Sequence, residues 1–161
     1  MDTANTDNPK EQLKEVIMKM TSFMELNCQA ELKEEADERG NKTLLVSVYT
    51  PENARFLIGK EGQNLKALEQ VLRAMFLKKL SEFNNITVDV NDYKRSRADY
   101  VADLARQAVT RVRSTQKAEA LVPMSPYERR VVHTELASCP DIATESIGTE
   151  PNRRIVIKPY P

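Results

Sequence analysis

The chain is poor in the residues on which most enzyme and metal sites are built. It contains one histidine, two cysteines and no tryptophan among 161 residues. His133, Cys28 and Cys139 share no spacing typical of a metal site, and no Ser/Cys–His pair is arranged for nucleophilic catalysis. The composition therefore argues against an enzyme, a metal site and a bound cofactor. Two lone thiols favour a reducing, cytoplasmic location.

Long apolar runs and targeting signals are also missing. No segment approaches the ~20 consecutive apolar residues that a membrane span requires, so we expect no membrane insertion. The N-terminus lacks the basic and apolar regions of a signal peptide. With 40% hydrophobic and 30% charged residues, the composition is typical of a folded globular protein.

A net charge of zero hides an uneven distribution. Residues 1–41 carry ten acidic and five basic side chains, whereas residues 93–130 carry nine basic and four acidic ones. This asymmetry suggests a polyanionic partner for the basic stretch. A solvated helix face is the alternative explanation, and the charge pattern alone favours it.

Apolar periodicity predicts two units that follow one another without a flexible linker. The first unit follows a disordered tail at 1–9 and begins with a helix over 10–25 and strands around 28–32 and 43–50. It continues with a two-turn helix opened by Thr50 and Pro51, a helix to about residue 82 and a strand at 86–90. In the second, over 93–161, we expect a helix to about residue 114, an extended segment at 119–123, a helix with a capping box at 125–137, and strands at 141–146 and 153–159. The fold class is therefore α+β.

The segment "IGKEGQNL" carries two of the chain's four glycines, Gly59 and Gly62. Without Cβ atoms, both allow close approach of a nucleic-acid backbone, and the free N–H groups of the following helix favour an anion. Lys60 would add positive charge, and Gln63 opens that helix. A plain helix–helix corner is the structural alternative, and it is the commoner meaning of an isolated GxxG pattern.

The context of this segment adds information. A β-hairpin, a two-turn helix, GxxG and a long helix in this order resemble a type II KH domain, in the αββααβ order, over residues 10–92. That family clamps about four nucleotides of single-stranded RNA or DNA with this loop. The resemblance implies that Gly59, Lys60, Gly62 and Gln63 contact the nucleic-acid backbone. Glu61 departs from the family pattern, which prefers neutral or basic residues.

A second motif lies in "YERRVVHTEL". Arg129 and His133 are four residues apart on the predicted helix, so they share one face and could grip a phosphate or stack on a base. The alternative is a half-buried core histidine beside Val132 and Leu136. The Arg-x-x-x-His pattern, followed by "TESIGTEPNRRIVIKP", resembles the small α/β R-three-H domain, a binder of single-stranded nucleic acid.

A KH-like unit (10–92) before an R-three-H unit (93–161) resembles the bacterial Jag family, also called KhpB. Jag proteins often carry a further N-terminal Jag-N domain, which we expect this chain to lack. The resemblance implies binding of single-stranded RNA, with a role as a post-transcriptional regulator or RNA chaperone. It also implies pairing with a small KH-domain protein or a homodimer. Single-stranded DNA fits the same pattern, because nothing here reports on a 2′-OH.

A basic cluster with one aromatic residue opens the helix that joins the two units. Its members, with one residue from the last strand, are predicted nucleic-acid contacts: Tyr93, Lys94, Arg95, Arg97 and Arg153. The basic charge continues along the helix through Arg106, Arg111, Arg113 and Lys117. Helix solubility is the structural alternative. The alternative function is a protein-interaction adaptor with a degenerate KH unit, which Glu61 and the zero net charge favour.

Overall fold

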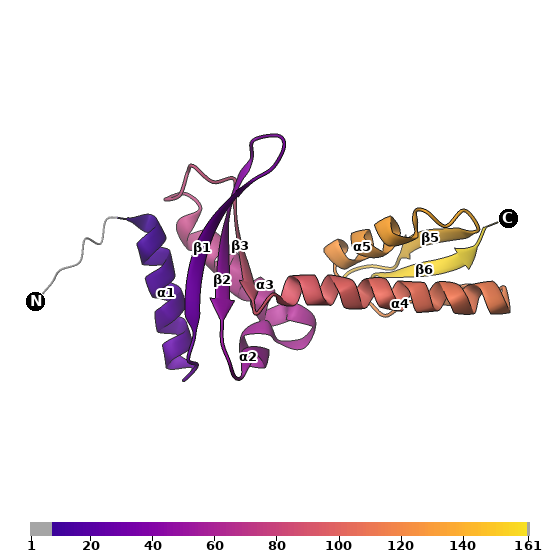
Figure 1. Ribbon diagram of the computed structural model, residues 1–161, viewed down its shortest axis with the longest axis horizontal. Helices are drawn as coiled ribbons and strands as arrows, with labels where there is room; N and C mark the ends of the chain where they lie inside the picture. Colours follow the sequence, from indigo (N-terminus) through magenta and orange to yellow (C-terminus); the bar gives the residue numbers. More distant parts are fainter. Residues whose placement is uncertain (1–7, 161) are drawn as a thin grey trace, which may run out of the picture. The chain divides into compact units, whose positions relative to one another are not determined.

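The computed structural model describes residues 8–160. The chain divides after Lys94 into two units, each with its own three-stranded sheet (Figure 1). The predicted α+β class is confirmed. Most of the tail predicted at 1–9 lies outside the described residues, but Pro9 is already helical, because the side chain of Asn8 accepts a hydrogen bond from the Lys10 N–H and caps the helix.

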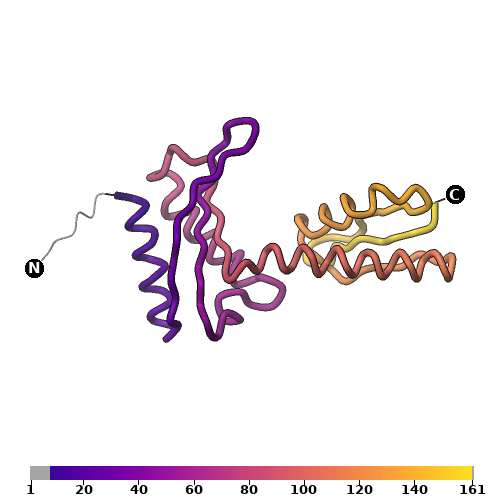
Figure 2. Tube along the Cα trace, viewed as in Figure 1, coloured from indigo at the N-terminus to yellow at the C-terminus, as the bar shows by residue number. Residues whose placement is uncertain are grey.

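The first unit follows the predicted order αββααβ. Its elements are α1 (Pro9–Phe23), β1 (Gln29–Ala36), β2 (Lys42–Tyr49), α2 (Ala54–Ile58), the 3-10 turn η1 (Lys60–Gly62), α3 (Gln63–Phe76) and β3 (Asn85–Val90). β1 pairs with β2 in antiparallel fashion through the hairpin that Figure 2 traces, and β2 pairs with β3 in parallel. The parallel pair requires a crossover connection, and α2 and α3 supply it.

Apolar residues at every second position of β2 and β3 place one face of this sheet in the core. Along β2 and β3, every second side chain is fully buried: Leu44, Val46, Val48, Ile86, Val88 and Val90. The residues between them face the other way. α1, α2 and α3 contribute to the same core through Leu13, Leu57 and Leu72, among others. The helices thus cover one face of the sheet and carry the GxxG segment on the turn between α2 and α3.

Three boundaries in the first unit differ from the sequence prediction. β1 continues to Ala36, beyond the predicted end near residue 32, because it stays paired with β2 as far as Lys42. α2 begins at Ala54 rather than at Pro51, after a left-handed Asn53. The hydroxyl of Thr50, predicted to cap the helix, instead donates to the Glu52 carbonyl at 2.7 Å. α3 ends at Phe76 rather than near residue 82, because the chain then tightens into turns that place Leu80 in the core.

The second unit contains α4 (Tyr93–Thr115), β4 (Glu119–Ala120), α5 (Pro126–Leu136), β5 (Ile142–Ile147) and β6 (Arg154–Pro159). The first two residues of α4 belong to the first unit. The sheet of the second unit has the strand order β4-β6-β5, and both strand pairs are antiparallel. The predicted capping box is confirmed, since the Ser125 and Glu128 side chains each accept a hydrogen bond from the other residue's backbone N–H.

Candidate nucleic-acid interface

The turn between α2 and α3 follows a backbone path that requires glycine at two positions. Gly59 has φ 72° and ψ −179°, a region essentially restricted to glycine, and Gly62 is left-handed with φ 80° and ψ 15°. A Cβ on Gly59 would lie 2.8 Å from the backbone nitrogen of Asn64. The geometry of the corner itself therefore demands both glycines, whatever the corner binds.

Exposed charge and an uncapped helix start lie at this corner. Lys60, Glu61 and Gln63 are all exposed, and Glu61 is left-handed with φ 52°. The N-cap of α3 is Gly62, which has no side chain to bond the first-turn N–H groups. The positive end of the α3 dipole therefore reaches the corner next to one cation and one anion.

An apolar groove of ≈ 310 Å³ adjoins the corner. It lies among α1, α2 and α3, and its lining includes Ile17, Met20, Thr21, Met24, Phe56, Leu57, Asn64, Ala67, Leu68 and Val71. Phe56 is half exposed at 50%, so an aromatic ring is available at the groove wall. Asn64, two residues after Gly62, connects this groove with the GxxG turn, because it lines the groove and bonds the Phe56 carbonyl.

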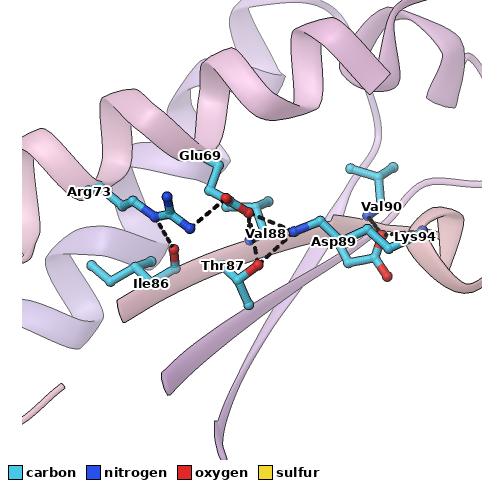
Figure 3. A network of polar contacts seen from close by, with 8 residues as sticks. All are labelled: Glu69, Arg73, Ile86, Thr87, Val88, Asp89, Val90 and Lys94. Carbon is cyan, nitrogen blue, oxygen red and sulfur yellow. Dashed lines mark hydrogen bonds and ion pairs between the residues drawn. The ribbon is translucent and has the colours of Figure 1, made fainter. Parts of the chain in front are cut away.

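Lys94, predicted to contact nucleic acid, is engaged inside the first unit (Figure 3). Its ammonium donates to Glu69 Oε2 at 2.7 Å and to the Thr87 hydroxyl at 2.6 Å. Glu69 also accepts from the Val88 N–H on the outer edge of β3. Arg73 donates to the Ile86 carbonyl on the same edge. This network satisfies polar groups of an edge strand and holds the first turn of α4.

The same network makes the first unit sensitive to acid. Burial raises the pKa of Glu69, but hydrogen bonds from Lys94, Val88 and Thr87 outweigh it and hold the pKa below the ordinary 4.5. The stabilisation is therefore complete above about pH 4.5 and is lost as the pH falls through the lowered value. We expect Glu69→Gln to cost about 2 kcal/mol of unfolding free energy near pH 7.

That difference from the wild type should shrink steadily below about pH 4.5. Urea denaturation followed by circular dichroism measures it at both ends of the range. Glu38→Gln, at an exposed turn position, is the matched control. A Glu69→Gln deficit that stays constant down to about pH 3 would contradict the account.

The remaining basic residues of α4 differ in their availability. Arg95 is exposed and makes no ion pair with the described residues, whereas Arg97 pairs with the buried Glu128 at 2.6 Å. Further along, the helix is neutralised by ion pairs: Arg106 with Asp103 and Glu135, Arg111 with Glu119, and Arg113 with Asp141. The basic stripe suggested by the sequence is thus largely a set of internal salt bridges.

The two residues of the Arg-x-x-x-His pattern have different environments on α5. Arg129 is buried: its guanidinium donates to the Met124 carbonyl at 2.8 Å and pairs with Glu150 at 2.8 Å. His133 is exposed, so the core-histidine alternative is wrong. The neighbouring Arg130 is exposed and has no ion pair with the described residues, which makes it the available cation on this helix.

Hydroxyl groups on β5 connect His133 with the last strand region. His133 Nδ1 lies 2.7 Å from Thr144 Oγ1, and Arg153 Nε donates to Ser146 Oγ at 2.9 Å. Thr144 and Ser146 are two residues apart on β5, so they share one face of the sheet. An imidazole and a guanidinium are therefore fixed along one strand, with both side chains accessible to solvent.

Sequence comparison identifies the second unit and relates most of the chain to known proteins. Residues 99–159 match the R-three-H domain family. RNA-binding protein KhpB of Bacillus subtilis (strain 168) is 36% identical over 110 residues, which cover 67% of this chain and 53% of that protein. KhpB of Clostridium symbiosum is 34% identical over 101 residues, covering 63% and 46% respectively. The chain is a KhpB-like protein with an R-three-H domain.

The KhpB-like chain spans about half the length of these curated relatives, at 46% and 53%. KhpB of Streptococcus pneumoniae serotype 2 matches over a longer stretch of this chain, 29% identical over 122 residues. No helix among residues 8–160 is long and apolar enough to cross a membrane.

Sequence reasoning overlooked two residues at these candidate sites. Asn64 donates from Nδ2 to the Phe56 carbonyl at 2.9 Å and thereby joins α3 to α2 across the corner. Arg130 is exposed, whereas the predicted contact Arg129 is buried. Asn64 could have been noticed in the sequence, because a short side-chain amide two positions after Gly62 can bond the backbone of the preceding helix. The choice between adjacent arginines depends on Glu150, which only the fold brings to Arg129.

Proposed function

We propose that this protein binds single-stranded RNA without catalysing a reaction, through a KH unit and an R-three-H unit. The observation that carries the proposal is the GxxG corner, where bare backbone and exposed Lys60 meet an apolar groove. Support comes from the αββααβ order, the R-three-H match and relatives named RNA-binding protein KhpB. Among the described residues, Cys28 and Cys139 are free thiols, in keeping with the proposed cytoplasmic location.

At the KH unit, the corner would receive the phosphate backbone and the groove would receive bases. Gly59 and Gly62 present no side chains, so a phosphate can approach the main chain and the positive end of α3. Lys60 adds a charge–charge attraction, and Gln63 supplies an amide donor. Phe56 offers a half-exposed ring on which a base can stack. This division gives affinity through phosphates and modest sequence preference through bases.

At the R-three-H unit, His133, Arg153 and Arg130 would make the contacts. All three are exposed, and two are held by β5 hydroxyls. Arg129, whose charge is already paired and buried, would act by positioning α5 rather than by touching RNA. Arg97 has the same character through its pair with Glu128, whereas Arg95 is exposed and free to contact a phosphate.

Photochemical crosslinking of the full chain to single-stranded RNA tests this assignment. Mass spectrometry of the crosslinked peptides should place the RNA on segments 54–68 and 127–134. Crosslinks confined to other segments would overturn the assignment. A parallel reaction with single-stranded DNA of the same sequence reports whether a 2′-OH contributes.

A second candidate function is association with another copy of the chain, which one specific observation favours. Large apolar side chains are exposed on α1, at its C-cap and on α3: Met20, Phe23, Met24, Val71 and Met75. Met20, Met24 and Val71 line one groove between the two helices. Phe23 is 89% exposed, although it is among the largest apolar side chains. A contiguous apolar patch usually marks an interaction site, and a self-complementary patch suits a two-fold dimer. A small KH-domain protein is the other partner that this surface would suit.

We expect the double variant Phe23→Ser/Met75→Ser to abolish self-association. Both substitutions remove exposed apolar surface that a second copy of the chain would bury in a dimer. Sedimentation equilibrium of the wild type should show a concentration-dependent dimer, and the double variant should remain monomeric. Substitution of the exposed Tyr160 by serine, on the second unit, is the control and should leave the dimer intact. A wild type that stays monomeric at every concentration would exclude the homodimer.

A further inference from the structure

Tyr93, the first residue of α4, packs its ring against the GxxG corner. A Cβ on Gly62 would lie 3.0 Å from Cε1, 3.5 Å from the hydroxyl oxygen and 3.7 Å from Cζ of this tyrosine. The ring is partly buried and also packs against the core of the first unit. Its edge therefore fills the space over Gly62 that any larger residue would occupy.

The main chain around Tyr93 is fixed by side-chain hydrogen bonds on both sides. Before it, the left-handed Asn91 bonds the Thr50 backbone twice: its Oδ1 accepts from the N–H at 3.0 Å, and its Nδ2 donates to the carbonyl at 2.8 Å. After it, the backbone N–H of Lys94 donates to Asp89 Oδ1 at 3.1 Å. The backbone that carries the Tyr93 ring is therefore held in place by residues of the first unit.

The opposite side of the corner has its own support. Asn64 donates to the Phe56 carbonyl, and its backbone nitrogen lies close against Gly59. The corner is therefore held between an amide on α3 and an aromatic ring on α4. A segment with three residues of positive φ, at 59, 61 and 62, has many other conformations to adopt without such supports.

We propose that Tyr93 is a positioning residue that holds the GxxG corner in its RNA-binding conformation before RNA arrives. This inference rests on the proposed RNA-binding function, and it replaces the direct nucleic-acid contact that the sequence suggested for Tyr93. The first turn of α4 then belongs functionally to the KH unit. When the corner is already ordered, RNA binding does not have to supply the free energy that ordering it would cost, so the affinity for RNA is higher.

The test uses the full chain with Tyr93→Ala and Tyr93→Phe, and Tyr100→Ala as the control on an exposed tyrosine of the same helix. Backbone amide order of residues 59–62 is measured by ¹⁵N relaxation without RNA, and affinity is measured with a labelled oligo-uridine. In Tyr93→Ala we expect increased amide mobility and an affinity for RNA that is weakened about tenfold. A tenfold loss is the expected penalty when the free corner adopts its binding conformation only about a tenth of the time. Tyr100→Ala should match the wild type in both, and Tyr93→Phe, which keeps the ring over Gly62, should lie much closer to the wild type than Tyr93→Ala does.

The free-state measurement separates positioning from direct contact. If affinity falls in Tyr93→Ala while the free corner stays as ordered as in the wild type, the tyrosine touches RNA and the inference is wrong. If the wild type binds no RNA, the proposed function fails, but the relaxation data still decide whether Tyr93 holds the corner. Should Tyr93→Ala not fold, Tyr93→Leu keeps an apolar side chain without a ring edge and is scored by the same two readouts.

Discussion

Replacing Lys60 and Glu61 together by aspartate is expected to weaken RNA binding at the GxxG corner while the fold stays intact. Reversing the Lys60 charge next to a phosphate turns an attraction of about 1 kcal/mol into a similar repulsion. The total of about 2 kcal/mol corresponds to roughly thirtyfold in affinity. Both side chains are exposed, so unfolding free energy should change by less than about 0.5 kcal/mol.

Glu61→Asn is the matched variant, and it is expected to change RNA affinity in the opposite direction. It removes the negative charge beside the phosphate site, and asparagine tolerates the left-handed backbone at φ 52° better than glutamate does. We therefore expect tighter RNA binding with equal or slightly higher stability. Fluorescence anisotropy with labelled single-stranded RNA measures both variants against the wild type. Equal affinity of all three proteins would mean that the corner is only a turn between helices.

The largest stability effect in the second unit is expected from Arg129→Ala. The substitution leaves the Met124 carbonyl and Glu150 without their guanidinium partner, in a site where the arginine side chain is 10% exposed. Loss of hydrogen bonds from a buried charged group costs about 2 kcal/mol. Hydrogen exchange of the α5 and β6 amides should accelerate accordingly. Arg130→Ala, at the neighbouring exposed position, should leave this exchange unchanged.

His133→Ala and Arg130→Ala should show the converse behaviour, with weaker RNA binding and unchanged amide exchange. Their side chains face solvent, so their removal uncovers no core. If Arg130→Ala leaves RNA affinity intact whereas a fully folded Arg129→Lys variant loses it, direct contact belongs to Arg129. The assignment of roles within the pair would then be reversed.

Local patterns in the sequence predicted much of this fold. The β-rich run "TLLVSVYT" and the alternation in "ITVDV" predicted two strands, and the structure buries Val46 and Val88 on them. The capping box at Ser125 and Glu128 was readable because both partners lie within one turn. The GxxG corner was placed correctly between two helices, since only glycine follows such a backbone.

Features that depend on distant residues could not be read in this way. The start of α2 was misplaced because Thr50 is held by Asn91, which is 41 positions away in the chain. The basic residues of α4 looked available because their acidic partners, such as Asp141 for Arg113, come from later elements. Likewise, the positions of Tyr93 beside Gly62 and of Lys94 beside Glu69 follow from the fold and not from their local sequence, and their contact with nucleic acid stays a prediction.

The central claim is that the GxxG corner binds the phosphates of single-stranded RNA, and the salt dependence of affinity tests it most directly. For the full chain and for Lys60→Asp/Glu61→Asp, affinity for one labelled RNA is measured between about 50 and 200 mM salt. We predict that log affinity of the wild type falls linearly with log salt, by about 0.7 for each phosphate neutralised, and that the variant has a shallower slope. No measurable affinity at the lowest salt, or equal slopes for the two proteins, would contradict the claim.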